Sequence, residues 1–160
     1  MSKALVYGNS INTDLVIAGK YTKTLNFQEL ADHCMEDLDP TFKTRMEPGD
    51  VVVAGTNFGC GSSREQAPLA MKYAGVGAVL AKSFARIFYR NAINVGLPVL
   101  VCDTDKIKDN DQIEIDFDQG IVTINGERQI TSQKLSPIMQ NILQAGGLTS
   151  FLKEKGDFIL

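Results

Sequence analysis

The chain has 160 residues, 44% of them hydrophobic and 22% charged, a composition typical of a soluble globular protein with a substantial core. Its formal net charge of −3 gives no electrostatic reason to expect nucleic acid or an anionic membrane surface as a partner. No apolar stretch approaches the roughly 20 residues that span a bilayer, and the first residues lack the pattern of a secretory signal. We therefore expect a soluble, cytoplasmic protein.

The first third of the chain contains a strand, a polar loop and a helix. The strand is expected at 3–7, and 12–14 (Asn-Thr-Asp) favours a turn stabilised by its own side chains. The basic segment 19–24 is expected to form an exposed loop. A helix over 26–39 follows, with Asn26 as its N-cap.

The stretch 51–101 alternates short apolar runs with helical segments. The runs are too short for helices and rich in β-branched residues, so we expect buried strands at 51–54, 76–81 and 97–101. Ser62 and Glu65 resemble a capping box at the start of the first connecting helix, and Ser83 is expected to cap the second. This β-α-β-α-β order predicts mainly parallel pairing with right-handed crossovers.

The last third has a different pattern. Residues 112–117 alternate with period two, and Asn125-Gly126 is a strong signal for a two-residue hairpin before a strand at 127–130. Ser136-Pro137 begins a helix that Gly146-Gly147 ends. We predict an α/β fold in which residues 1–160 form a single domain, with a parallel central unit and an antiparallel β extension.

Ligands for a metal are few and scattered. Cys34, Cys60, Cys102 and the single histidine, His33, show no metal-site spacing. His33 falls off the apolar face of its helix, which favours a solvated polar role. We expect reduced thiols, and neither zinc nor an iron–sulfur cluster held by this chain alone.

The loop after the first central strand has the composition of an anion site. Gly59 and Gly61 allow close backbone approach, Arg64 carries a forked cation, and a helix N-terminus attracts negative charge. The alternative is that Ser62 only caps the helix and Arg64 is a surface cation. The loop lacks the Gly-Lys-Ser/Thr ending of a nucleotide-hydrolysing loop and the Gly-x-Ser-x-Gly elbow of serine hydrolases.

Arg86 and Arg90 are four residues apart and therefore share one face of the second helix. Two cations in this arrangement either line a partner surface or pair with acids. The residues alone leave both possibilities open.

Two long stretches resemble the swivel domain of the aconitase superfamily, and more closely the separate small subunits of isopropylmalate dehydratases. They are 57–65, Asn-Phe-Gly-Cys-Gly-Ser-Ser-Arg-Glu, and 81–91, Ala-Lys-Ser-Phe-Ala-Arg-Ile-Phe-Tyr-Arg-Asn. Segments 12–14 and 145–148 match as well, so the resemblance covers nearly the whole chain. It implies a swivelling β/β/α domain.

The resemblance also implies an activity and a partner. The activity is a hydro-lyase of leucine biosynthesis, which converts 2-isopropylmalate to 3-isopropylmalate through isopropylmaleate. The partner is a large subunit that holds a [4Fe-4S] cluster, over which this chain closes in a heterodimer or heterotetramer. Mapped onto this sequence, Ser62 would be the general base, and Ser63 and Arg64 would bind a carboxylate of a dicarboxylic or tricarboxylic acid. The supporting positions would be Asp14, Gly59 and Gly61.

The same resemblance marks Tyr21, Thr22, Lys23 and Thr24 as the loop that contacts the variable arm of the substrate. Apolar residues there favour an isopropyl group, whereas an arginine favours the extra carboxylate of homoaconitate. Lys23 would either pair with such a carboxylate or remain a surface lysine. Isopropylmalate is the first expectation, and homoaconitase or a dimethylmalate or citramalate dehydratase is the alternative. A non-catalytic anion-binding or regulatory subunit is the alternative from another class.

Overall fold

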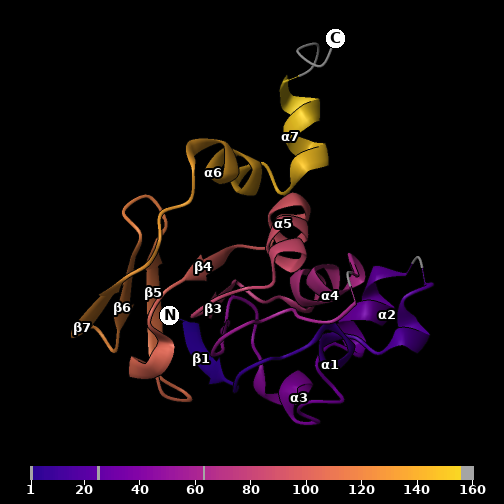
Figure 1. Cartoon of the computed structure of the whole chain (residues 1–160), viewed down its shortest axis with the longest axis horizontal. Helices are drawn as coiled ribbons and strands as arrows, with labels where there is room; N and C mark the ends of the chain where they lie inside the picture. Colours follow the sequence, from indigo (N-terminus) through magenta and orange to yellow (C-terminus); the bar gives the residue numbers. More distant parts are fainter. Residues whose placement is uncertain (1, 25, 63, 156–160) are drawn as a thin grey trace.

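The framework of the protein is one seven-stranded sheet, seen in a computed structural model that describes residues 2–24, 26–62 and 64–155 (Figure 1). The strand order is β4-β3-β2-β1-β5-β6-β7. The parallel strands are β1 (Ser2–Val6), β2 (Val51–Val53), β3 (Ala78–Ala81) and β4 (Val99–Val101). The antiparallel strands are β5 (Gln112–Asp116), β6 (Ile121–Ile124) and β7 (Arg128–Thr131). The predicted α/β fold, with a parallel unit and an antiparallel extension, is confirmed.

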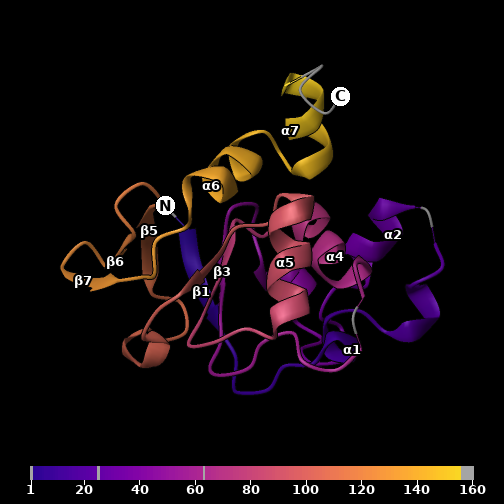
Figure 2. The same ribbon diagram turned by 45° about the horizontal axis from the view of Figure 1, so that its top comes forward.

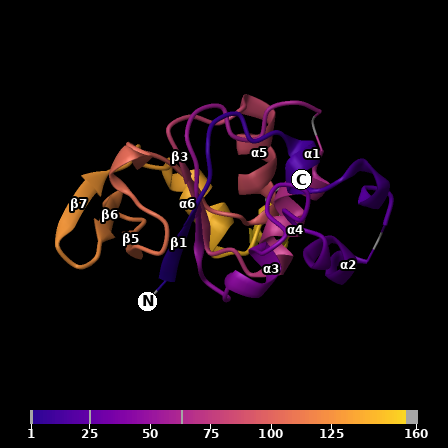
Figure 3. The ribbon, with the colours of Figure 1, turned by 90° about the horizontal axis from the view of Figure 1, so that it is seen from below.

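The helices between the parallel strands lie on one side of them. Helix α4 (Gln66–Ala74) joins β2 to β3, and α5 (Arg86–Val95) joins β3 to β4. Between β1 and β2 lie α1 (Thr13–Val16), η1 (Gly19–Tyr21), α2 (Phe27–Asp32) and α3 (Phe42–Arg45). Because β1 to β4 are neighbours in chain order, crossovers of one hand place these helices on the same face, as Figure 3 shows, with β5–β7 on the other side.

The sheet curls, so that its two ends approach each other. The backbone N–H of Gln133, just after β7, donates to the carbonyl of Val101 in β4 at 2.8 Å. All residues of β2 and β3 are buried, which explains their continuous apolar runs. Short η2 (Thr104–Lys106) follows β4, and α6 (Pro137–Gln144) and α7 (Leu148–Lys155) pack against α5 (Figure 2). None of the described helices is long and apolar enough to cross a membrane.

Several predicted helix limits are wrong. Neither α4 nor α5 has a side-chain cap, so Ser62 and Ser83 cap no helix. The Ser83 hydroxyl instead accepts a hydrogen bond from the backbone N–H of Asn57 at 2.7 Å. This bond joins the loop that follows β2 to the segment that follows β3. Helix α2 does begin at its Asn26 cap, but it ends before Met35, whose φ of 63° leaves the helical region. Helix α7 was not predicted.

A buried carboxylate fixes the start of β2. Asp50 is 4% exposed and accepts hydrogen bonds from the Lys3 backbone N–H (3.0 Å), the Lys3 ammonium (2.5 Å) and the Glu47 N–H (2.9 Å). Burial pushes the pKa of Asp50 upward, but these hydrogen bonds outweigh it and the net pKa is lowered.

We expect Asp50→Asn to lower the free energy of unfolding at pH 7. The expected loss is about 2 to 3 kcal/mol, below the range for fully buried pairs because the Lys3 side chain is a quarter exposed. Because the pKa of Asp50 is lower in the folded than in the unfolded protein, its carboxylate stabilises the folded state fully above the unfolded-state pKa of about 4. This stabilisation is lost as the pH falls through the folded-state pKa. Urea unfolding from pH 7 to pH 3 should therefore show the difference from wild type narrowing below about pH 4. A constant difference, or an equal loss in the exposed-site control Asp37→Asn, would contradict this role.

Candidate functional site

The segments that follow β1, β2 and β3 stay side by side beyond the carboxyl ends of these strands. The glycine-rich loop, residues 55–61, lies in the middle. Its Gly59 N–H donates to Ile11 O at 2.8 Å, and its Phe58 N–H donates to Ser83 O at 3.0 Å. Isolated parallel bridges join Asn12 to Cys60 and Phe58 to Phe84. The glycine-rich loop therefore lies at the carboxyl ends of the parallel strands, where α/β proteins commonly bind ligands.

Aromatic rings pack beneath this loop, on its buried side. Phe58 is fully buried, with ring centroids 5.2 Å from Phe88 and 6.0 Å from Phe84. Gly59 has a φ of +85°, and a Cβ there would overlap the Phe88 ring. The glycine is thus required twice, for its backbone conformation and for the close approach of α5.

Thr13, the first residue of α1, holds the segment that carries the predicted base. The hydroxyl of Thr13, a residue only 1% exposed, donates to Ser62 O at 2.7 Å, and the Thr13 N–H donates to Cys60 O at 2.9 Å. Ser62 itself is exposed. Thr13 escaped the prediction because its residue type fits an isolated turn equally well. Its position two residues after buried Ile11 was the available signal.

Arg64 is held from two sides. Its Nη1 lies 2.5 Å from Asp14 Oδ1, and its guanidinium packs against Gly19, two residues before the predicted specificity loop. Asp14 is more than half exposed, whereas the Arg64 side chain is three-quarters buried. The structure thus brings together predicted residues that lie 50 positions apart, and Asp14 orients the guanidinium.

A pocket of about 220 Å³ opens beside this loop. Its lining residues are Thr13, Gly59, Gly61, Arg64, Ala85, Arg86, Ile87 and Phe88. The only charged side chains among them are the two arginines. An anion is the ligand that such a lining favours.

The helix at this pocket is not the one that the sequence predicted. The first turn of α5 lines the pocket, and its N-cap residue, Ala85, offers no side-chain hydrogen bond. Helix α4 begins only at Gln66, four residues after Ser62. The positive end of α5 therefore replaces that of α4 in the predicted anion site. Arg86 is a pocket residue whose role the sequence left open.

The predicted specificity loop is anchored at both ends. The Tyr21 ring stacks on His33 with a centroid distance of 4.0 Å, and His33 Nδ1 lies 2.5 Å from Glu36 Oε2, so His33 is a partnered residue. The hydroxyl of Thr22 donates to Gly19 O at 2.8 Å, and that of Thr24 donates to Glu29 Oε2 at 3.2 Å. Lys23 is exposed and, within the described part of the chain, forms no ion pair. Ser63 lies outside the described residues.

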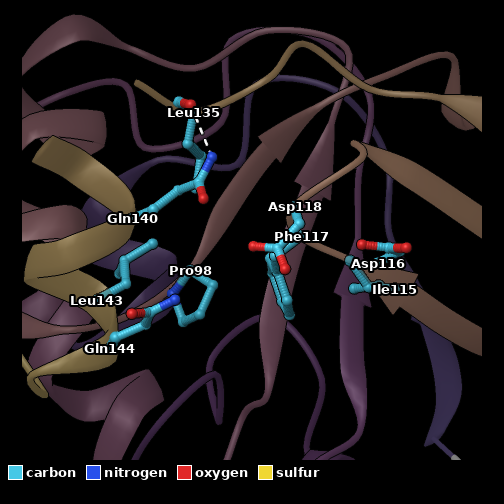
Figure 4. Close-up of a pocket in the computed structure, with 9 residues that line it drawn as sticks. All are labelled: Pro98, Ile115, Asp116, Phe117, Asp118, Leu135, Gln140, Leu143 and Gln144. Carbon is cyan, nitrogen blue, oxygen red and sulfur yellow. Dashed lines mark hydrogen bonds between the residues drawn. The ribbon is translucent and has the colours of Figure 1, made fainter. Parts of the chain in front are cut away.

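A larger pocket of about 530 Å³ lies at the opposite end of the parallel strands, between α6 and the end of β5 (Figure 4). Its lining is mostly apolar, and Asp116 and Asp118 are its charged residues. Two carboxylates repel an anionic ligand. We therefore place the candidate site at the smaller, cationic pocket.

Cysteine and other metal-ligating side chains do not gather at this site. Across the described ranges, no group of three or more His, Cys, Asp or Glu residues is placed to hold a metal ion. Cys34 and Cys102 are buried, and burial raises the pKa of the Cys102 thiol to about 11, with the nearby charge of Asp103 adding to the shift. Cys60 is partly exposed within the glycine-rich loop.

Comparison with known proteins gives a consistent family. The aconitase C-terminal domain family matches residues 5–104. The 3-isopropylmalate dehydratase small subunit of Ruminiclostridium cellulolyticum is 49% identical over 154 residues, covering 94% of both chains. The methanogen homoaconitase small subunit of Methanocaldococcus jannaschii is 51% identical over 154 residues, covering 96% of this chain and 91% of its own.

A solved structure is also similar to this chain. The crystal structure of a 3-isopropylmalate dehydratase from Methanocaldococcus jannaschii matches it with a TM-score of 0.92 and 50% identity, covering 96% of this chain and 93% of the other. Its likeness extends over the curled sheet and the helices on it. The chain therefore belongs to the aconitase C-terminal domain family and, within it, to the 3-isopropylmalate dehydratase small subunits.

Proposed function

We propose that this chain is the small subunit of a hydro-lyase that converts 2-isopropylmalate to 3-isopropylmalate through isopropylmaleate. The observation that carries the proposal is the placement of Arg64. Asp14 orients the Arg64 guanidinium, and the pocket that Arg64 lines has, among the described residues, only one other charged lining side chain, that of Arg86. A dicarboxylic acid is the kind of substrate that this charge distribution favours.

Within this proposal, Ser62 removes the proton from the carbon next to a substrate carboxylate. Thr13 fixes its backbone, and the arginines and the first turn of α5 supply positive charge that favours an alkoxide. Arg64, with Ser63, binds the carboxylate and holds that carbon against the Ser62 hydroxyl. The family resemblance is the ground for assigning these roles to Ser62 and Ser63.

The site needs a partner to complete it. The described residues offer no metal-ligand cluster, and Ser62 is exposed. A [4Fe-4S] cluster on a large subunit would supply the Lewis acid for the substrate hydroxyl. This chain then contributes the base and the carboxylate contact, and closing the interface excludes water from them.

An anaerobic assay tests the proposal. The chain is co-purified with the large subunit of the same organism, the cluster is reconstituted, and hydration of isopropylmaleate, homoaconitate and citraconate is compared. We expect the highest kcat/KM with isopropylmaleate and no turnover by the isolated chain. Turnover without a partner, or no hydration of any of the three acids by the complex, would overturn the assignment.

A homoaconitase is the second candidate, and exposed Lys23 is the observation that favours it. The loop that carries Lys23 begins against the Arg64 guanidinium, and a substrate with a third carboxylate could pair with the Lys23 ammonium. A lysine acts as a point charge and not as a fork, so it would favour such a substrate less than an arginine does.

We expect Lys23→Leu to lower kcat/KM for homoaconitate about tenfold, a loss typical of a charge-assisted contact. The value for isopropylmaleate should change less than about threefold, since that substrate has no third carboxylate. Lys20→Leu is the matched control, because Lys20 lies in the same loop, over the Tyr21 ring. An equal effect of Lys23→Leu on both substrates would contradict a specificity role.

A further inference from the structure

The two arginines of α5 differ from the other arginines of the chain. Arg45, Arg64 and Arg128 each have an acidic partner within 4.0 Å. Arg86 and Arg90 are exposed, and among the described residues neither lies within that distance of a carboxylate.

An exposed apolar side chain lies beside these arginines. Ile87 is 50% exposed although it is large and hydrophobic. Arg86, Ile87 and Arg90 therefore form one surface on the first turns of α5, which we call the α5 face. Exposed arginine around an apolar residue is a composition that protein interfaces favour.

The α5 face is continuous with the candidate site. Arg86 and Ile87 line the pocket that Arg64 also lines, whereas Arg90 is not among the lining residues. Arg90 lies one helical turn further on, about 6 Å along the axis. A substrate small enough for the pocket can reach Arg86, but Arg90 requires a larger ligand beside it.

We infer that the α5 face is a docking surface for an acidic surface on the large subunit, with Arg90 and Arg86 contacting its carboxylates and Ile87 packing between them. The inference rests on the proposed function, which requires a partner over this pocket. Charge complementarity selects the occupant, because a second copy of this chain would place arginine against arginine.

Two measurable properties follow from such an interface. Opposite charges accelerate the encounter of the subunits and increase its dependence on ionic strength. Replacing one arginine by an acidic residue places a negative charge against the partner's carboxylates. Binding is then weakened by the new repulsion as well as by the loss of the attractive contact.

The test measures association of the full chain with the cluster-free large subunit of the same organism, so it does not depend on activity. We expect Arg90→Glu to weaken the Kd at least about tenfold and to lower the association rate, with a shallower salt dependence than wild type. Arg90→Gln should give an intermediate Kd, and it serves as the second variant where the reversal impairs folding, which circular dichroism reports. Lys108→Glu makes the same charge change at an exposed residue outside the α5 face, and its Kd should remain within about twofold of wild type.

The outcomes separate the two proposals. A Kd for folded Arg90→Glu within twofold of wild type, or an equal loss in Lys108→Glu, would overturn the docking surface and leave the proposed function intact. Failure of the wild-type chain to bind the large subunit would overturn the proposed function, and the docking surface with it.

Discussion

Substituting Ser62 by alanine is expected to lower kcat of the reconstituted complex about 10³-fold. A positioned general base contributes typically 10² to 10⁴ in rate. Thr13 is the residue with a hydroxyl among those that line the pocket, and this hydroxyl donates to Ser62 O. The Thr13 hydroxyl bonds the Ser62 carbonyl and not its side chain, so the loop should keep its conformation. Steady-state hydration of isopropylmaleate, with the large subunit in excess, measures the loss.

Two controls test whether the loss of kcat is specific to the Ser62 hydroxyl. Ser150→Ala removes an equivalent hydroxyl from an exposed position on α7, and it should leave kcat unchanged. The affinity of Ser62→Ala for the large subunit should equal that of wild type, because the hydroxyl is not needed for docking. Turnover within tenfold of wild type would instead identify the chain as a non-catalytic binding or regulatory subunit.

Gly59→Ala is expected to cost about 2 to 5 kcal/mol in free energy of unfolding and to abolish turnover. A left-handed backbone disfavours an L side chain by about 1 to 2 kcal/mol, and overpacking against Phe88 adds about 1 to 3 kcal/mol. The added methyl displaces either the α5 ring or the loop, and both line the pocket. Denaturant unfolding and the hydration assay measure the two losses.

Gly146→Ala separates the two contributions. Gly146 has a similar φ of +92°, but a Cβ there meets no atom within 4 Å. We expect it to cost about 1 to 2 kcal/mol, through the backbone alone, with turnover retained. Equal losses at the two glycines would show that contact with Phe88 does not determine the conformation of the loop.

The positions of the strands and the sense of their pairing were predictable because the signals are local and consistent. Continuous apolar runs identified the buried parallel strands, and Asn125-Gly126 marked the hairpin, where both residues have positive φ. The hairpin loop has three residues, 125–127, and not the two that this dipeptide predicts. The Ser136 cap also forms, accepting the backbone N–H of Met139 at 3.3 Å. In these segments, tertiary contacts reinforce the local preference.

The helix starts near the site were not predictable, because their polar residues serve long-range contacts. Ser83 bonds Asn57, 26 residues away, and Thr13 bonds Ser62, 49 residues away. The hydroxyl of Ser83, the predicted cap of α5, is therefore engaged away from the helix, although serine is common at caps. Of the residues named from the sequence, Gly59, Gly61 and Arg64 line the pocket, whereas the contribution of Thr13 and of the α5 N-terminus emerged only from the packing.

The hydrogen bonds that join the ends of β1, β2 and β3 also bear on how the protein moves. The glycine-rich loop is bonded on both sides to neighbouring connections, and its Phe58 is fully buried in the core. A loop fixed in this way has no hinge of its own, unlike the mobile lids that cover many enzyme sites. We therefore expect opening and closing of the site to occur by rigid-body rotation of the whole chain against its partner, with the loop geometry preserved throughout.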